Sequence, residues 1–146
     1  MKPTTALRAA SVVSFLYFAG HTAGFPWTPS PEPLTQSVVG PMKASAFDVM
    51  GTSRTYWDFY LGFGLTNSVL MLLESVVLWL LATLAKDDAR RLRPLLVAIL
   101  VASVVQLGLV LRFFFIAPLV LNVVLIVVLL LALRATRAEA SKAATG

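Results

Sequence analysis

The hydrophobic positions of the chain fall into four runs, and the last two runs are uninterrupted by charge. Leu95–Leu111 contains 17 residues and Phe113–Leu133 contains 21. A bilayer core about 30 Å thick requires roughly 20 helical residues. One helix through both runs would therefore be too long for a single crossing. The pattern predicts two spans, at about 94–112 and 117–134, joined by a tight turn near Arg112–Pro118.

The two earlier runs are less uniform. The second run extends from about residue 56 to residue 84 and is interrupted only by Asp58 and Glu74. The first run, at about 7–24, follows Lys2 and Arg8, an arrangement that is also typical of a signal peptide. The sequence that follows, "GHTAGFPW", offers no good cleavage site with two small residues, so a retained helix is expected.

The basic residues predict the orientation of these four spans. With both termini inside, nine of the 12 Lys and Arg residues flank the spans on the inner side, and only Lys43, Arg54 and Arg112 lie outside. Positive residues favour the cytoplasmic side. We therefore expect an all-α, integral membrane four-helix bundle with N-in/C-in topology, one domain over residues 1–146, in a bacterial inner (plasma) membrane. The polar tail 135–146 is expected to fray into the cytoplasm.

The single long connection is the predicted outer loop at 25–55. Five prolines, at positions 26, 29, 31, 33 and 41, predict an extended start without a long helix. Phe47 and Met50 are expected to face the membrane or the mouth of the bundle. Long ordered loops are often lids or binding elements. The alternative is an interfacial cap held by Phe25 and Trp27 as aromatic anchors.

The composition excludes several kinds of site but does not identify an activity. The chain is 58% hydrophobic and 13% charged, against about 25% charged residues in soluble proteins. It has no cysteine and one histidine, so disulfides, thiolate metal sites and His-rich metal sites are excluded. We expect no metal and no cofactor. The net charge of +5 comes from residues beside the hydrophobic runs, which indicates a topology signal rather than nucleic-acid binding.

Polar residues recur along the second span. Tyr60, Asn67 and Glu74 are spaced by seven and lie within about 40° of one another on a helix. Asp58 points the opposite way and is expected to be a solvated or capping acid. A lipid-facing carboxylate is costly, so Glu74 should face the bundle interior. There it is either a proton acceptor or ligand counter-ion, or a structural carboxyl bonded to Gln106 or a serine.

The other spans contribute polar positions that can meet this face. Ser14, Tyr17 and His21 share one face of the first span, and His21 is either a hydrogen-bonded interfacial side chain or a general acid/base. Gly62 and Gly64 are expected to allow close helix packing. The candidate ligand-binding residues are His21, Tyr60, Asn67, Glu74, Gln106 and Asn122, with His21 and Glu74 as candidates for catalysis. If they converge, they line a pocket that opens to the outside.

Two motifs support a family resemblance. "GHTAGFPW" at the end of the first span and "FDVMGTSRTYWDFYLGFG" at the entry to the second resemble a family of small bacterial four-helix membrane proteins of unknown function. The resemblance covers the first half of the chain. It implies the four-helix fold but no activity.

The leading functional hypothesis is a membrane protein that binds a small amphipathic or lipid-like molecule in an interior polar pocket. Three alternatives remain open: an enzyme doing acid/base chemistry on a lipid or sterol-like substrate, a small transporter subunit, or an accessory helix bundle without a ligand. No Walker loop, GxSxG elbow or HExxH motif occurs. Membrane lipids are expected partners, nucleic acid is not, and homo-oligomers are compatible with the sequence.

Overall fold

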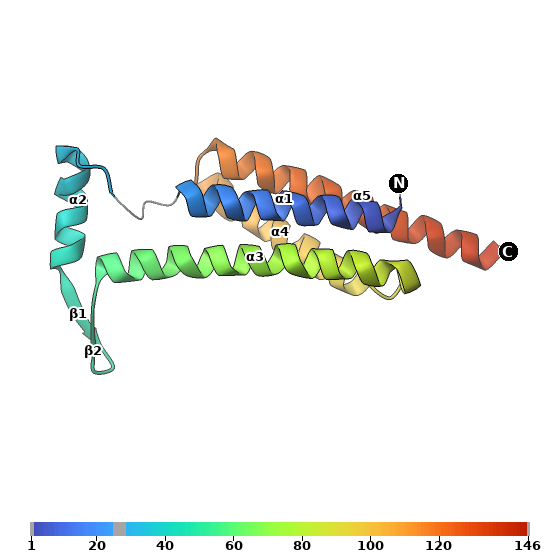
Figure 1. Cartoon of the computed structure of the whole chain (residues 1–146), viewed down its shortest axis with the longest axis horizontal. Coiled ribbons are helices and arrows are strands. Elements are labelled where there is room, and N and C mark those ends of the chain that lie inside the picture. Colours follow the sequence, from blue (N-terminus) through green and yellow to red (C-terminus); the bar gives the residue numbers. More distant parts are fainter. Residues whose placement is uncertain (1, 25–28, 146) are drawn as a thin grey trace. The chain divides into compact units, whose positions relative to one another are not determined.

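A computed structural model describes the backbone of residues 2–24 and 29–145 and the side chains up to residue 138. Helices dominate these residues, with one short β-hairpin between the second and third helix (Figure 1). The elements are α1 (Pro3–Gly24), α2 (Pro33–Ala44), β1 (Ala46–Val49), β2 (Thr52–Thr55), α3 (Tyr56–Asp88), α4 (Arg93–Phe113) and α5 (Ile116–Thr145).

Within the described residues, three helices are long and apolar enough to cross a membrane. They are Tyr56–Asp88, Arg93–Phe113 and Ile116–Ala138. This agrees with the expected all-helical membrane protein. Helix α1 has 22 residues but is more polar than these three, because Arg8, His21 and several hydroxyl side chains interrupt its apolar run.

The chain divides into two compact units. The first unit comprises Met1–Gly20 and Met71–Gly146, and the second comprises His21–Leu70. Most of α1, the later part of α3, and helices α4 and α5 therefore form the first unit. The end of α1, helix α2, the hairpin and the beginning of α3 form the second unit.

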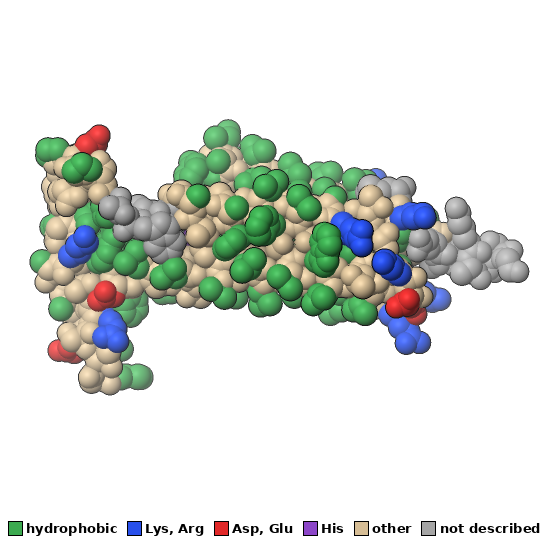
Figure 2. Space-filling view, viewed as in Figure 1, with side chains coloured by type: hydrophobic (Ala, Val, Ile, Leu, Met, Phe, Trp, Pro, Cys, Tyr) green, Lys and Arg blue, Asp and Glu red, His purple; other side chains and the backbone are tan. Residues whose placement is uncertain are grey.

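The core of the first unit is built from leucine and alanine side chains of all four helices, including Leu7, Leu78, Leu96, Leu125 and Leu129. The buried positions recur at spacings of three and four residues, which places them on one face of each helix. The remaining hydrophobic side chains are exposed over the length of the unit, and Lys and Arg side chains gather at one end of it (Figure 2). This distribution is typical of a helical bundle that faces lipid.

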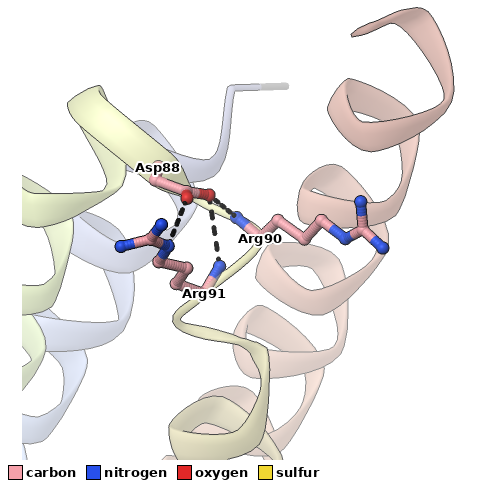
Figure 3. A network of polar contacts seen from close by, with 3 residues as sticks. All are labelled: Asp88, Arg90 and Arg91. Carbon is pink, nitrogen blue, oxygen red and sulfur yellow. Dashed lines mark hydrogen bonds and ion pairs between the residues drawn. The ribbon is translucent and has the colours of Figure 1, made fainter. Parts of the chain in front are cut away.

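The turn between α3 and α4 lies at this basic end and is fixed by Asp88. One carboxylate oxygen of Asp88 accepts the backbone N–H groups of Arg90 and Arg91, at 3.1 and 3.3 Å. The other oxygen lies 2.9 Å from Nε of Arg91, while the Arg90 side chain extends away from the carboxylate (Figure 3). The short inner loop thus reverses the chain and leaves its arginines at the surface.

The turn between α4 and α5 agrees with the prediction. Helix α4 ends at Phe113 and α5 begins at Ile116, and the N–H of Phe114 donates to the carbonyl of Val110 at 3.0 Å. Pro118 falls in the first turn of α5, where a missing N–H breaks no internal hydrogen bond.

The expectation of a frayed C-terminal tail is wrong, because the backbone of α5 stays helical through Thr145. The segment after Arg134 is rich in Ala, Arg, Glu and Lys, which have high helix propensities. The polar composition of the tail therefore did not mean that it lacked structure.

The extended start expected before Pro33 is present at residues 29–32, which are non-helical, and a helix begins directly after it. Helix α2 has 12 residues and starts at Pro33. Proline is favoured at this first position because it has no N–H, and an N–H there would find no acceptor within the helix. Pro41 lies inside the helix, and its carbonyl accepts the N–H of Ser45 at 2.8 Å, which closes the last turn. The predicted anchors Phe25 and Trp27 lie outside the described residues.

A β-hairpin follows α2 and leads directly into α3. Strands β1 and β2 pair antiparallel from Ala46 with Thr55 to Val49 with Thr52. The two turn residues, Met50 and Gly51, have φ angles of 50° and 78°, and two successive positive φ angles match the twist of a tight hairpin. Met50 is fully exposed at the tip.

The other end of the hairpin is held by aromatic contacts in the second unit. The Phe47 ring centroid lies 4.9 Å from that of Tyr56 and 5.1 Å from that of Phe59. The ammonium group of Lys43 lies 5.1 Å from the ring centroid of Trp57, a cation–π contact between α2 and α3. These contacts fix the loop against the start of α3.

Candidate functional site

A pair of serines joins α1 to α3 in the first unit. The Ser11 hydroxyl donates to the Ser75 carbonyl at 2.8 Å, and the Ser75 hydroxyl donates to the Ser11 carbonyl at 3.0 Å. Both side chains are buried. Because each hydroxyl reaches the other helix's backbone, the two helices approach closely here, as small residues allow in membrane bundles.

Glu74 lies one residue before this contact and is half-buried. The hydroxyl of Ser14 donates to Oε2 of Glu74 at 2.8 Å, and it also lies 3.4 Å from the carbonyl of Met71. The sequence predicted a serine or Gln106 as the partner of this carboxyl group. The serine is confirmed, and the bond occupies one of the acceptor positions of the carboxyl group.

Tyr17 extends this arrangement to a third helix. Its side chain is 7% exposed and lies close enough to interact with the side chains of Gln106 on α4 and Glu74 on α3. We refer to Ser14, Tyr17, Glu74 and Gln106 as the Glu74 cluster. Sequence reasoning placed Ser14 and Tyr17 on one helical face but did not include either among the ligand-binding residues.

Asn122 on α5 is the deepest of the predicted residues. Its side chain is 1% exposed, and no described group lies within hydrogen-bonding distance of its Oδ1 atom. It shares the inward face of α5 with Leu125 and Leu129 of the core. Asn122 and Gln106 each lie about 10 Å from the α4–α5 turn at the usual helical rise, so the two amides are at the same level of the hairpin.

The second unit holds His21 and Asn67 in direct contact. Asn67 Nδ2 lies 3.3 Å from Nε2 of His21, and His21 Nδ1 lies 3.1 Å from the Ser68 hydroxyl. The Thr22 hydroxyl donates to the same serine at 3.0 Å. Because an amide nitrogen can only donate, this geometry fits a neutral imidazole with its proton on Nδ1. Both ring nitrogens therefore have protein partners, as expected for a hydrogen-bonded histidine.

Two other predictions concern the start of α3. The N–H of Thr55 donates to Oδ2 of Asp58 at 2.8 Å, and the N–H of Asp58 donates to the Thr55 hydroxyl at 3.1 Å. This reciprocal capping box confirms the capping role of Asp58. The packing role expected for Gly62 is wrong, because a Cβ atom there would meet nothing within 4 Å. Tyr60 keeps 40% of its surface exposed.

The six predicted ligand-binding residues are thus divided between the two units. Glu74, Gln106 and Asn122 belong to the first unit, and His21, Tyr60 and Asn67 belong to the second. The described residues contain no group of three or more His, Cys, Asp or Glu side chains that could hold a metal ion. In the first unit, Glu74 and Asn122 can form hydrogen bonds, and the Glu74 carboxyl group can also exchange a proton.

A hollow also marks the surface of the second unit. It has a volume of about 300 Å³ and is lined by Arg54, Asp58, Phe59, Gly62, Phe63 and Thr66. Asp58 already accepts the Thr55 N–H here, so this carboxylate serves the helix start.

Comparison with protein-family models, curated protein sequences and solved structures gives no match. The resemblance to small bacterial four-helix membrane proteins therefore stays a prediction from the two sequence motifs.

Proposed function

We propose that the chain is a four-span protein of a bacterial inner membrane with both termini in the cytoplasm, related to the family that its motifs resemble. The packing of α1 supports the fourth span. Ser11 bonds to Ser75 and Ser14 bonds to Glu74 on a helix long enough to cross the membrane. Residues that pack against the middle of such a helix lie at the depth of the bilayer. Four spans put both termini on one side, where most of the basic residues also lie.

Within this bundle, we propose that the first unit binds a small amphipathic or lipid-like molecule through a polar group. The observation that carries the proposal is the Oδ1 atom of Asn122, which is buried and has no described donor. An unsatisfied buried acceptor costs about 1–3 kcal/mol. In a membrane neither bulk water nor lipid tails can supply a donor. A hydroxyl or amine group of a bound molecule would remove this cost.

The Glu74 cluster supports the same assignment. It brings a carboxyl, two hydroxyls and an amide from α1, α3 and α4 together in the same unit. These groups can donate and accept hydrogen bonds. The leucine side chains of the core provide apolar surroundings for the hydrophobic part of the bound molecule. Ligand sites generally combine an apolar lining with a few polar groups of this kind.

The test compares the wild-type chain with Asn122→Leu, which removes the acceptor and keeps a side chain branched at the same carbon. Both are purified in a mild detergent, and molecules that remain bound are identified by native mass spectrometry. The wild-type chain should carry a bound molecule and Asn122→Leu should not. Ser103→Ala is the matched control, because the Ser103 hydroxyl donates to Ile99 of its own helix at 2.9 Å and should not affect the bound molecule.

The contrary outcome is equally specific. If the wild-type and Asn122→Leu proteins both carry no bound molecule, and the variant unfolds with a free energy about 1–3 kcal/mol higher than the wild type, the interior is dry. The Asn122 amide is then a tolerated polar side chain, and the binding proposal fails.

A further inference from the structure

A groove on the outside of the first unit runs between α1 and α3 and has not been assigned a role. Its volume is about 290 Å³. It is lined by Ser11, Val12, Phe15, Ser75, Val76, Trp79 and Leu80. The two serines at its base donate to each other's backbone, so they offer no spare hydroxyl hydrogen. The groove therefore offers a ligand mainly apolar contacts, because the hydroxyl hydrogens of the two serines at its base are already used.

Arg8 stands at one end of this groove. Its guanidinium carbon lies 5.1 Å from the ring centroid of Trp79. A cation–π contact of this kind does not use the N–H donors of the guanidinium, so they can still bind an acceptor. No described carboxylate forms an ion pair with Arg8, and the side chain is exposed.

This end of the unit carries more basic than acidic side chains, with Asp87 and Asp88 next to Lys86. Lys and Arg side chains gather there (Figure 2), and Lys86 follows Trp79 by seven residues on the same face of α3. Trp side chains favour the level of the lipid headgroups, and Arg side chains bind phosphate with a planar pair of donors. The acyl chains of a lipid would extend from this level along the groove towards Phe15.

We propose that the groove between α1 and α3 binds one acyl chain of an anionic phospholipid, with Arg8 holding the lipid phosphate. This site is independent of the interior site at Asn122. Its ligand is a lipid of the surrounding bilayer. The lipid is recognised by the charge of Arg8 at the end of the groove, whereas the interior site uses the buried amide of Asn122.

A second copy of the chain is a poorer occupant of the same groove. In a two-fold dimer with both copies in one orientation, each residue of the groove meets the same region of its partner at the same depth. Arg8 would then approach the partner's Arg8 in a region that already carries Lys86. The repulsion between these charges disfavours that contact, whereas the phosphate of an anionic lipid neutralises it.

The test uses Trp79 as the reporter. The full chain, with Trp27→Phe and Trp57→Phe so that Trp79 alone fluoresces, is reconstituted in phosphatidylcholine bilayers that contain increasing fractions of phosphatidylglycerol with brominated acyl chains. Bromine quenches tryptophan at short range, so saturating quenching at a low phosphatidylglycerol fraction reports occupancy of the groove. Brominated phosphatidylcholine is the comparison lipid.

Arg8→Gln should raise the phosphatidylglycerol fraction needed for half-maximal quenching roughly tenfold, the order expected for loss of one charge-assisted hydrogen bond. Arg137→Gln removes one charge from the exposed basic end of α5, away from the groove lining, and should leave the curve unchanged. Val12→Phe fills part of the groove without adding a second tryptophan and should weaken the preference for phosphatidylglycerol. Circular dichroism confirms that each variant retains its helices.

Two results overturn the proposal. If brominated phosphatidylglycerol and brominated phosphatidylcholine quench Trp79 equally in the protein that retains Arg8, then Arg8 does not recognise the lipid headgroup. A crosslinked dimer that Val12→Phe dissociates would show that the groove is an interface between two copies. Because the readout is independent of any molecule bound at Asn122, failure here leaves the interior proposal intact.

Discussion

The reciprocal bonds between Ser11 and Ser75 allow a quantitative prediction about how α1 is held to α3. Each hydroxyl donates to the backbone carbonyl of the other residue, at 2.8 and 3.0 Å. The two hydroxyl oxygens are 3.4 Å apart, which is longer than either of these bonds. The two bonds therefore have different donors and different acceptors, and removal of one leaves the other in place.

Side-chain hydrogen bonds between membrane helices contribute about 0.6 kcal/mol on average and at most about 1.7 kcal/mol. Ser11→Ala and Ser75→Ala should each lower the free energy of unfolding by an amount in this range. The double variant should lose about the sum, close to 1.2 kcal/mol for average bonds. A double-mutant cycle tests this additivity, because residues in contact can show coupling energies of about 0.5 kcal/mol or more.

The measurement is reversible unfolding in lipid–detergent bicelles, followed by far-ultraviolet circular dichroism. Ser103→Ala is the matched control, because it removes a buried hydroxyl that bonds within its own helix. The reasoning is refuted if either single variant loses as much stability as the double variant. That result would mean that one bond between the two hydroxyls joins the helices and the backbone carbonyls are not involved.

Two further predictions concern the start of α3. Thr55→Ala removes one half of the capping box with Asp58 and should cost about 0.5–2 kcal/mol of helix stability. The effect should be visible as faster hydrogen exchange at the first amides of α3 and not at those of α4. Gly62→Ala should raise the free energy of unfolding by about 0.5–1 kcal/mol, because alanine is favoured in a helix interior and the site is open. A loss of stability on chemical unfolding would show that another chain packs against Gly62.

The crossing helices could be predicted because their signals are long and local. The two charge-free runs and the short breaks beside them are sufficient for α4, α5 and the turn between them. The capping role of Asp58 was also predicted, because an acid near the start of an apolar run is typical of a helix N-terminus. In each of these cases, residues close in sequence determine the structure, so no knowledge of tertiary packing was needed.

The loop elements depended on competing signals that the sequence did not resolve. Prolines suggested an extended segment, but Pro33 is placed where proline begins a helix. The hairpin has only four residues in each strand, and its turn uses Met50 before Gly51 in place of the more usual Asn or Asp. A non-glycine residue with a positive φ angle is seldom predicted from composition.

The partners within the candidate site depended on the rotation of each helix. Heptad spacing placed Tyr60, Asn67 and Glu74 on one face, but it could not specify which residues of α1 lie opposite. Ser14 and Tyr17 lie next to Glu74 because the small side chains of Ser11 and Ser75 let the two helices come close together at this rotation. Such packing is a property of two segments together, and one sequence without aligned relatives does not reveal it.

The interior polar groups differ in a way that bears on function. Glu74 has Ser14 as a donor, whereas Oδ1 of Asn122 has no donor in the described part of the chain. A satisfied pair can stabilise the bundle without any ligand, so Glu74 alone does not distinguish a binding site from helix packing. Asn122 does distinguish them, because the sign of the stability change in Asn122→Leu depends on whether a molecule is bound. In an empty bundle Asn122→Leu removes a desolvation cost and stabilises the protein. In a bundle that retains its molecule, the same change removes that molecule's hydrogen bond and the stabilisation that binding provides, so the variant unfolds more easily.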